Sequence, residues 1–126
     1  MLTVDGDQSA TDLFEFVAQN SNVEWSLVRS GKQMNSLTTS NKPHSEGGGA
    51  DIIYNFAVSG NVNVREHIHS HPTSLTGPSG FHPSHQKTGD KDFAQWMGKY
   101  LPNATLQVYE KRTQKYIKYN STGIIK

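Results

Sequence analysis

Three histidines on alternate positions are the first candidates for chemistry in this chain. Five of the six histidines lie between residues 67 and 85, and the densest stretch reads His67-Ile-His69-Ser-His71-Pro72. Alternate side chains of a β-strand point the same way, so neighbouring histidines of this stretch can converge on one ion. Neutral imidazole is a zinc ligand, and a catalytic zinc site needs only three protein ligands and a water. We therefore expect a metal site at a strand end, although solvated loop histidines would give the same spacing.

The position of the proline decides which pair of histidines is favoured. Pro72 follows His71 directly and stops strand pairing there, which puts His69 and His71 at the edge of the sheet. A site on His67 and His69 would lie about 7 Å deeper along the strand. We expect His69 and His71 to be the ligands, with His67 as a neighbour on the same face.

Two carboxylates supply the remaining parts of a zinc hydrolase. Asp90 opens a helix after a long loop, and Glu24 stands on an early strand. Two histidines and one aspartate would hold the ion, and the glutamate would be the general base. Without other evidence, a strand glutamate such as Glu24 is more often an ordinary exposed residue. Helix capping is the ordinary role of an aspartate at such a place, and Asp92 is the alternative third ligand. Glu46, in a glycine-rich loop, and Glu66, expected on the face opposite the histidines, compete with Glu24 as the base.

The apolar periodicity predicts the elements that must position these side chains. It indicates a helix over 9–20, strands over 23–28, 33–40, 52–58 and 62–70, a helix over 90–100 and a hairpin over 104–120. In the first helix we expect Ser9 or Thr11 as the cap, and Leu13, Phe16 and Val17 on the buried face. Residues 72–89 are rich in proline and glycine, and long loops in compact domains are often functional.

Composition excludes several classes of protein. The chain has 126 residues and no cysteine, so disulfides, cysteine-type zinc sites and the cysteine-dependent zinc deaminases are ruled out. No apolar run approaches the length of a membrane span, and the first residues lack the basic and apolar regions of a signal peptide. Residues 64–126 carry most of the basic side chains, but these are spread out as on a solvated face. We expect neither a nucleic-acid nor a membrane partner.

The motifs resemble those of the JAMM (MPN-type) metallopeptidases. The shared features are His69-Ser70-His71-Pro72, the Ser/Gly/Pro-rich loop that follows, and an aspartate at a helix start. The stretch "VEWSLVRSG" is similar to the strand that carries the family's catalytic glutamate, and the order of elements matches from about residue 10 to 119. Within the family, the chain looks most like the JAB-like toxin domains of bacterial polymorphic toxins.

The resemblance implies zinc as the cofactor, His69, His71 and Asp90 as metal ligands, and Glu24 as the catalytic base. The loop departs from the family pattern, which expects a serine and an aspartate where Gly80 and Pro83 stand. Asp90 comes seven positions late, which indicates an insertion. The oxyanion-stabilising serine is assigned first to Ser79, with Ser84 and Thr88 as alternatives.

The implied fold is one α/β domain over residues 1–126. We expect a mixed β-sheet flanked by an N-terminal helix and by a helix after the metal-binding loop, with a C-terminal β-hairpin. The implied activity is zinc-dependent hydrolysis of a peptide or isopeptide bond in a protein substrate. The resemblance also implies that the chain is the effector domain of a larger bacterial toxin and is secreted or delivered with it. An immunity protein would then be a partner. The alternatives are an isopeptidase resembling deubiquitinases, without a toxin role, and an inactive MPN-type scaffold that binds a protein.

Overall fold

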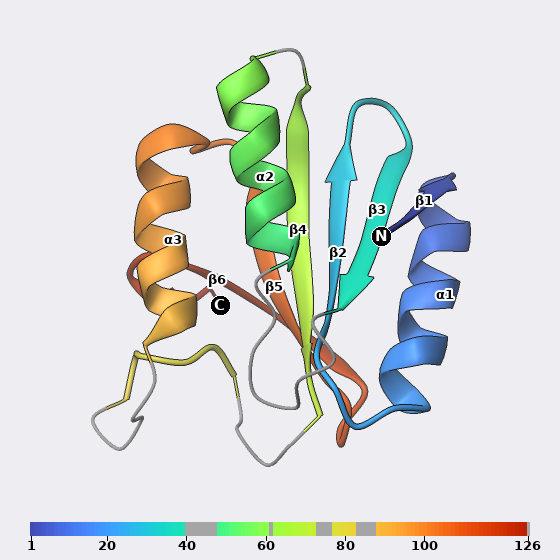
Figure 1. The fold of residues 1–126 in the computed structure, drawn as a ribbon. Coiled ribbons are helices and arrows are strands. Elements are labelled where there is room, and N and C mark those ends of the chain that lie inside the picture. The colour runs from blue at the N-terminus through green and yellow to red at the C-terminus, as the bar shows by residue number, and fades with distance from the viewer. Residues whose placement is uncertain (40–47, 61, 73–76, 83–87, 126) are drawn as a thin grey trace.

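A computed structural model gives the fold of the chain (Figure 1). It describes all residues except 40–47, 61, 73–76, 83–87 and 126. The elements run in the order β1 (Leu2–Asp5), α1 (Asp7–Gln19), β2 (Trp25–Ser30), β3 (Met34–Thr39), α2 (Gly48–Ser59), β4 (Val64–His71), α3 (Gly89–Tyr100), β5 (Thr105–Glu110), β6 (Lys115–Asn120) and β7 (Gly123–Ile124).

All strands belong to one mixed sheet, in the order β1-β3-β2-β4-β5-β6-β7. Each neighbouring pair is antiparallel except β4 and β5, which run parallel and are joined through α3. The strand that carries the histidines therefore lies at the centre of the sheet, between β2 and β5. This confirms the α/β class, the mixed sheet, its two flanking helices and the closing β5–β6 hairpin.

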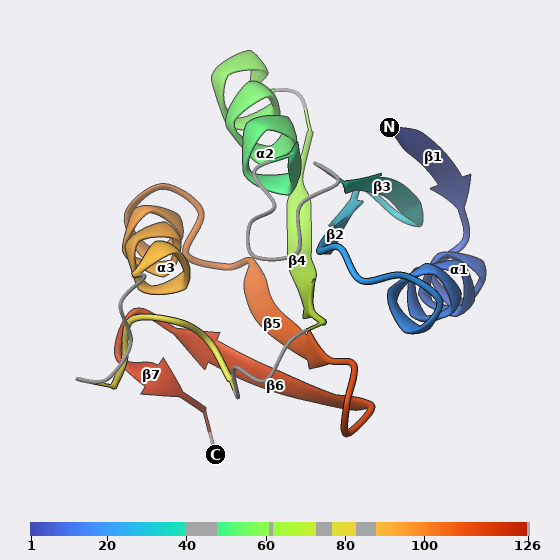
Figure 2. The same ribbon diagram turned by 60° about the horizontal axis from the view of Figure 1, so that its bottom comes forward.

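The helices cover opposite faces of the sheet (Figures 1 and 2). Helix α1 packs on one face, where Phe14, Leu27 and Ile68 are buried together. Helices α2 and α3 cover the other face, where Ile53, Met97 and Val108 belong to a second core cluster. Because apolar side chains are buried on both faces, the central strands have few solvent-facing positions.

The expectation of a buried strand at 52–58 is wrong, because these residues form most of α2. Ile53 is fully buried, and Ile52 and Phe56 pack against the same core cluster, whereas Tyr54 and Val58 are exposed. That spacing of three and four residues is helical. A short apolar run cannot be assigned by periodicity alone, and the three glycines before it hid the helix start.

Helix α1 differs from its prediction at its start and on its buried face. It begins at Asp7 after Gly6, and neither Ser9 nor Thr11 caps it with a side-chain hydrogen bond. Its buried residues are Ala10, Phe14 and Ala18, whereas Phe16 is 63% exposed. Leu13 and Val17 are partly buried against the same core cluster, so of the three expected residues only Phe16 faces away from it, and Phe14 is the large side chain that fills the core.

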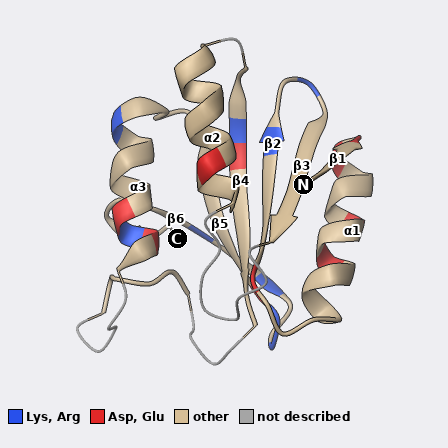
Figure 3. Ribbon diagram, in the orientation of Figure 1, with Lys and Arg blue, Asp and Glu red and all other residues tan. Residues whose placement is uncertain are grey.

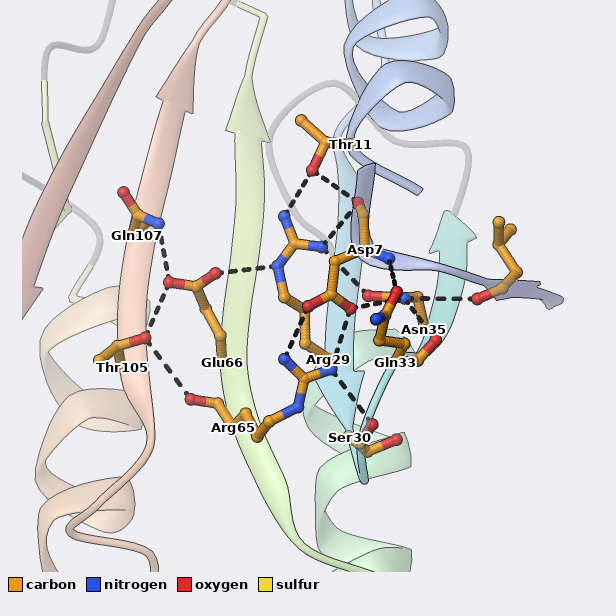
Figure 4. Close-up of polar contacts among 11 residues, drawn as sticks. Asp7, Thr11, Arg29, Ser30, Gln33, Asn35, Arg65, Glu66, Thr105 and Gln107 are labelled. Atoms are coloured by element: carbon orange, nitrogen blue, oxygen red, sulfur yellow. Dashed lines mark hydrogen bonds and ion pairs between the residues drawn. The ribbon is translucent and has the colours of Figure 1, made fainter. Parts of the chain in front are cut away.

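Polar contacts fasten the start of α1 to the sheet (Figure 4). The Arg65 guanidinium donates to both carboxylate oxygens of Asp7, at 2.9 and 3.0 Å. Arg29 pairs with Glu66 at 3.0 Å and donates to Thr11 Oγ1 at 2.6 Å. The network ties α1 to β2 and β4 on the face opposite α2 and α3.

Other predicted elements agree with the structure to within a few residues. The strand expected at 33–40 is β3, the strand expected at 62–70 is β4, and the helix expected at 90–100 is α3. The short strands β1 and β7 at the two edges of the sheet were not predicted, since neither has enough residues to show an alternating pattern. No helix in the described part of the chain is long and apolar enough to cross a membrane.

Candidate metal centre

Strands β2 and β4 bring Glu24 and the histidines to one face of the sheet. In the antiparallel ladder Ser26 lies opposite His69. Residues directly opposite each other in such a ladder carry their side chains on the same face. Glu24 is two residues before Ser26 and His71 is two residues after His69, so all four side chains alternate onto one face. Residues 45 or more positions apart in sequence thus become neighbours at the strand ends.

The ligand atoms of His69, His71 and Asp90 lie close together. The two Nε2 atoms are 3.0 Å apart, and Asp90 places Oδ1 2.9 Å from His69 Nε2 and Oδ2 3.3 Å from His71 Nε2. Atoms bound to a tetrahedral zinc ion at about 2.0–2.1 Å are about 3.3 Å from one another. Two imidazoles and one carboxylate at this spacing fit a zinc ion.

Glu24 lies beside this group and is buried, with 8% of the residue exposed. One carboxylate oxygen of Glu24 and one nitrogen of each of His69 and His71 are all within 4.8 Å of one another. The buried set of Glu24, His69 and His71 could therefore hold a metal ion. Together with Asp90, the site offers two histidines and two carboxylates. A catalytic zinc ion needs three protein ligands, so one of the two carboxylates is left for a role other than metal binding.

Asp90 is not the cap of its helix. Thr88 occupies the N-cap position of α3 and makes no capping hydrogen bond with its side chain. The carboxylate of Asp90 points instead to the two histidines, and only 15% of the side chain is exposed. Asp92, the alternative ligand, is exposed and accepts a hydrogen bond from Thr88 Oγ1 at 2.8 Å. The structure therefore brings Asp90, and not Asp92, to the histidines.

Ser79 is joined to Asp90 by two reciprocal hydrogen bonds. The Ser79 backbone N–H donates to Asp90 Oδ2 at 2.7 Å, and the Asp90 backbone N–H donates to Ser79 Oγ at 3.0 Å. Of the serine and threonine alternatives, Ser84 lies outside the described residues and Thr88 is bonded to Asp92. Ser79 is thus the candidate that the described structure places against the proposed ligands.

Electrostatics favour a charged Asp90 and a neutral His67. Burial raises the pKa of the Asp90 carboxyl, but His69 and His71 outweigh that effect and hold this pKa well below its usual range. Burial, followed by the repulsion from His69, lowers the pKa of His67 to about 3. The ring of His67 packs edge-on against Phe93 with centroids 5.0 Å apart, and neither ring nitrogen has a hydrogen-bond partner among the described residues. His67 is thus a packed neighbour of the candidate metal centre.

Two contacts that sequence reasoning missed fix the backbone at Glu24. Thr39 Oγ1 donates to the Glu24 carbonyl at 2.6 Å, and the Trp25 backbone N–H donates to Ser70 Oγ at 2.9 Å. Ser70 lies between the two histidines in sequence and is 1% exposed. Its position in the motif was the only available signal, and the contact depends on a strand register that the sequence does not specify.

Of the two competing glutamates, the structure describes Glu66, which does not join the group. Glu66 lies on the opposite face, as expected, where it pairs with Arg29 and accepts hydrogen bonds from Thr105 and Gln107 at 2.8 Å each. Figure 4 shows these partners around its carboxylate. Glu46 lies outside the described residues.

A protein-family model matches most of the chain. The family model described as JAB-like toxin 1 matches residues 2–95, which is more than half of the chain. The chain belongs to the JAB-like toxin family. The matched segment of this JAB-like toxin domain ends within α3. It includes all the candidate site residues, which are Glu24, His69, His71, Ser79 and Asp90. No curated protein matches the chain.

Proposed function

We propose that this JAB-like toxin domain is a zinc metallopeptidase that hydrolyses a peptide or isopeptide bond in a protein. The observation that supports it most is the convergence of His69, His71 and Asp90 with the buried carboxylate of Glu24. Three ligands with a separate carboxylate are the parts of a hydrolytic zinc site. In this proposal His69, His71 and Asp90 hold the ion, and Glu24 is the general base.

The chain's own residues divide the work of the reaction. Bound zinc would make a water molecule a better nucleophile at neutral pH and would polarise the substrate carbonyl. Glu24 takes the proton of the attacking water and returns it to the leaving amine. Ser79 Oγ accepts the Asp90 N–H, so the hydroxyl proton of Ser79 is left to donate to the developing oxyanion.

The contact between Ser79 and Asp90 also bears on the inactive-scaffold alternative. That alternative rested on the irregular spacing of serine and aspartate after the histidine motif. In the structure the longer loop still brings the Asp90 carboxylate beside the histidines and Ser79 into hydrogen-bond contact with Asp90. This contact supports an enzyme over a scaffold. The proposal also includes use of the domain as a toxin effector and its control by an immunity protein.

The Glu24→Gln variant tests the proposal. We expect wild-type protein with one bound zinc to cleave bonds in a mixture of linear and lysine-branched peptides, followed as new amino termini by mass spectrometry. Without the base, turnover should fall by about 10²–10⁴-fold while zinc stays bound. The branched peptides distinguish isopeptide from peptide cleavage.

Equal cleavage by Glu24→Gln and wild type would exclude Glu24 as the base. A zinc-loaded wild type that cleaves neither kind of peptide would instead favour the scaffold. Glu66→Gln is the matched control, because it alters a glutamate on the opposite face of the sheet and should leave turnover per folded molecule unchanged.

A further inference from the structure

Glu110 is a buried carboxylate at the end of β5, beyond the residues that the family model matches. It is 7% exposed and lies beside His71 in the parallel ladder of β4 and β5. Side by side in that ladder, the two residues share the face that carries the candidate metal centre. The roles proposed above for the metal centre leave Glu110 without a function.

Both oxygens of Glu110 accept hydrogen bonds from loop residues. The Gly77 backbone N–H donates to Oε2 at 3.0 Å, and Thr113 Oγ1 donates to Oε1 at 3.2 Å. Gly77 has a φ of +74°, a conformation that favours glycine, so the chain turns sharply where Glu110 holds it. A buried carboxylate is costly unless it is hydrogen-bonded, and here a loop amide supplies one of the bonds.

The segment that starts at Gly77 reaches the metal centre two residues later. Ser79 donates its N–H to Asp90 Oδ2 and accepts the Asp90 N–H, and its carbonyl accepts the Lys91 N–H at 3.1 Å. The short segment from 77 to 79 is therefore held at one end by Glu110 and at the other by Asp90. Asp90 in turn has one oxygen on Ser79 and the other beside His69.

We propose that Glu110 is a positioning residue for Asp90 and Ser79, acting through the Gly77 amide. The inference rests on the proposed function for the role of Asp90 and Ser79 at a zinc site. The chain of contacts from Glu110 through Gly77 and Ser79 to Asp90 does not depend on that function. Glu110 fixes Gly77, Gly77 places Ser79, and the Ser79 amide sets the rotation of the Asp90 carboxylate toward the histidines. Partners behind metal ligands typically change metal affinity by about 10–100-fold when they are removed.

The test compares three variants, Glu110→Ala, Glu110→Gln and Glu15→Ala, with the wild-type chain of residues 1–126. Zinc affinity is measured by competition with a chelator, and hydrogen exchange of the Gly77 and Ser79 amides is followed by NMR. Glu110→Ala should weaken zinc binding by about tenfold or more and speed exchange at both amides. Glu110→Gln keeps an acceptor for Gly77 and should stay within about threefold of wild type.

Glu15→Ala is the control for a general loss of stability. Glu15 accepts a hydrogen bond from Tyr116 Oη at 2.6 Å, and Tyr116 packs against the core cluster under α1. Glu15→Ala therefore removes a carboxylate hydrogen bond that lies away from the candidate metal centre. The inference is overturned if Glu15→Ala weakens zinc binding as much as Glu110→Ala does. It is also overturned if Glu110→Ala leaves exchange at Ser79 unchanged.

The two proposals fail in different ways. A wild-type protein that binds no zinc would remove the proposed function. The exchange rate of the Ser79 amide in Glu110→Ala would still decide the inference in that case, because faster exchange supports the link from Glu110 and unchanged exchange refutes it.

Discussion

Ser70 is a small side chain between the two histidines proposed as metal ligands. It alternates with His69 and His71, is buried, and accepts the backbone N–H of Trp25. Through that bond the strand that carries the ligands holds the residue next to Glu24. The distance between Glu24 and the two histidines thus depends on a serine that is not part of the candidate site.

The Ser70→Ala variant should impair catalysis more than metal binding. It leaves the Trp25 N–H without its partner, which costs about 1–3 kcal/mol of stability and loosens the backbone at Glu24. We expect kcat to fall by about tenfold with one zinc still bound, because a misplaced base loses part of its effect. Ser70→Thr keeps the hydroxyl and is the control. Equal activity of the alanine variant and wild type would show that the bond does not position Glu24.

Sequence reasoning is strongest for residues whose type carries the chemistry. His69, His71, Asp90 and Glu24 could be named because imidazole and carboxylate groups are few and their order along the chain is informative. Glu110 and Ser70 could not be assigned their contacts, since these depend on which strands are neighbours and in what register. The reciprocal bonds of Ser79 and Asp90 likewise depend on the path of an enlarged loop.

At the scale of elements, α2 is the part that the sequence misrepresented most. It packs over β2 and β4 so closely that a Cβ on Gly49 would meet His67 Nε2 at 2.6 Å and Ser26 Cβ at 2.7 Å. Neither neighbour can retreat easily, because both are buried and His67 is packed against Phe93. The glycines that hid the start of this helix thus include one that its close packing requires.

Gly49→Ala should destabilise the protein by about 1–3 kcal/mol, because the added methyl group overpacks the contact between α2 and the sheet. Gly98→Ala, in α3, is the matched control. The nearest atom to its added Cβ is Ser121 Oγ at 4.0 Å, so it should stabilise by about 0.5–1 kcal/mol through helix propensity. Denaturant unfolding measures both. Equal effects of the two substitutions would contradict the close packing of α2.

At the scale of the whole molecule, the fold brings together candidate site residues from three separate parts of the chain. Glu24 comes from just before β2, the histidines from the end of β4, and Asp90 from the start of α3. The arrangement needs the antiparallel pairing of β2 with β4 and the return of α3 over the same face. The order of elements along the sequence agreed with this fold, which is why the α/β class could be predicted although one helix was mistaken for a strand.

The charges of the residues that the structure describes do not single out a second functional surface. In the described part of the chain, basic positions are spread over α3, β2, the β2–β3 turn, β4 and the β5–β6 hairpin (Figure 3). The two arginines on β2 and β4 are engaged with Glu66 and Asp7. The candidate metal centre therefore remains the feature on which an account of function depends.

The measurement that tests this account most directly is a crystal structure grown with zinc, with the ion located by its anomalous scattering. We predict one ion bound by His69 Nε2, His71 Nε2 and an oxygen of Asp90 at about 2.0–2.2 Å, with the Glu24 carboxylate nearby but not bound to it. Zinc bound by Glu24 in place of Asp90, or no zinc on these histidines, would contradict the account.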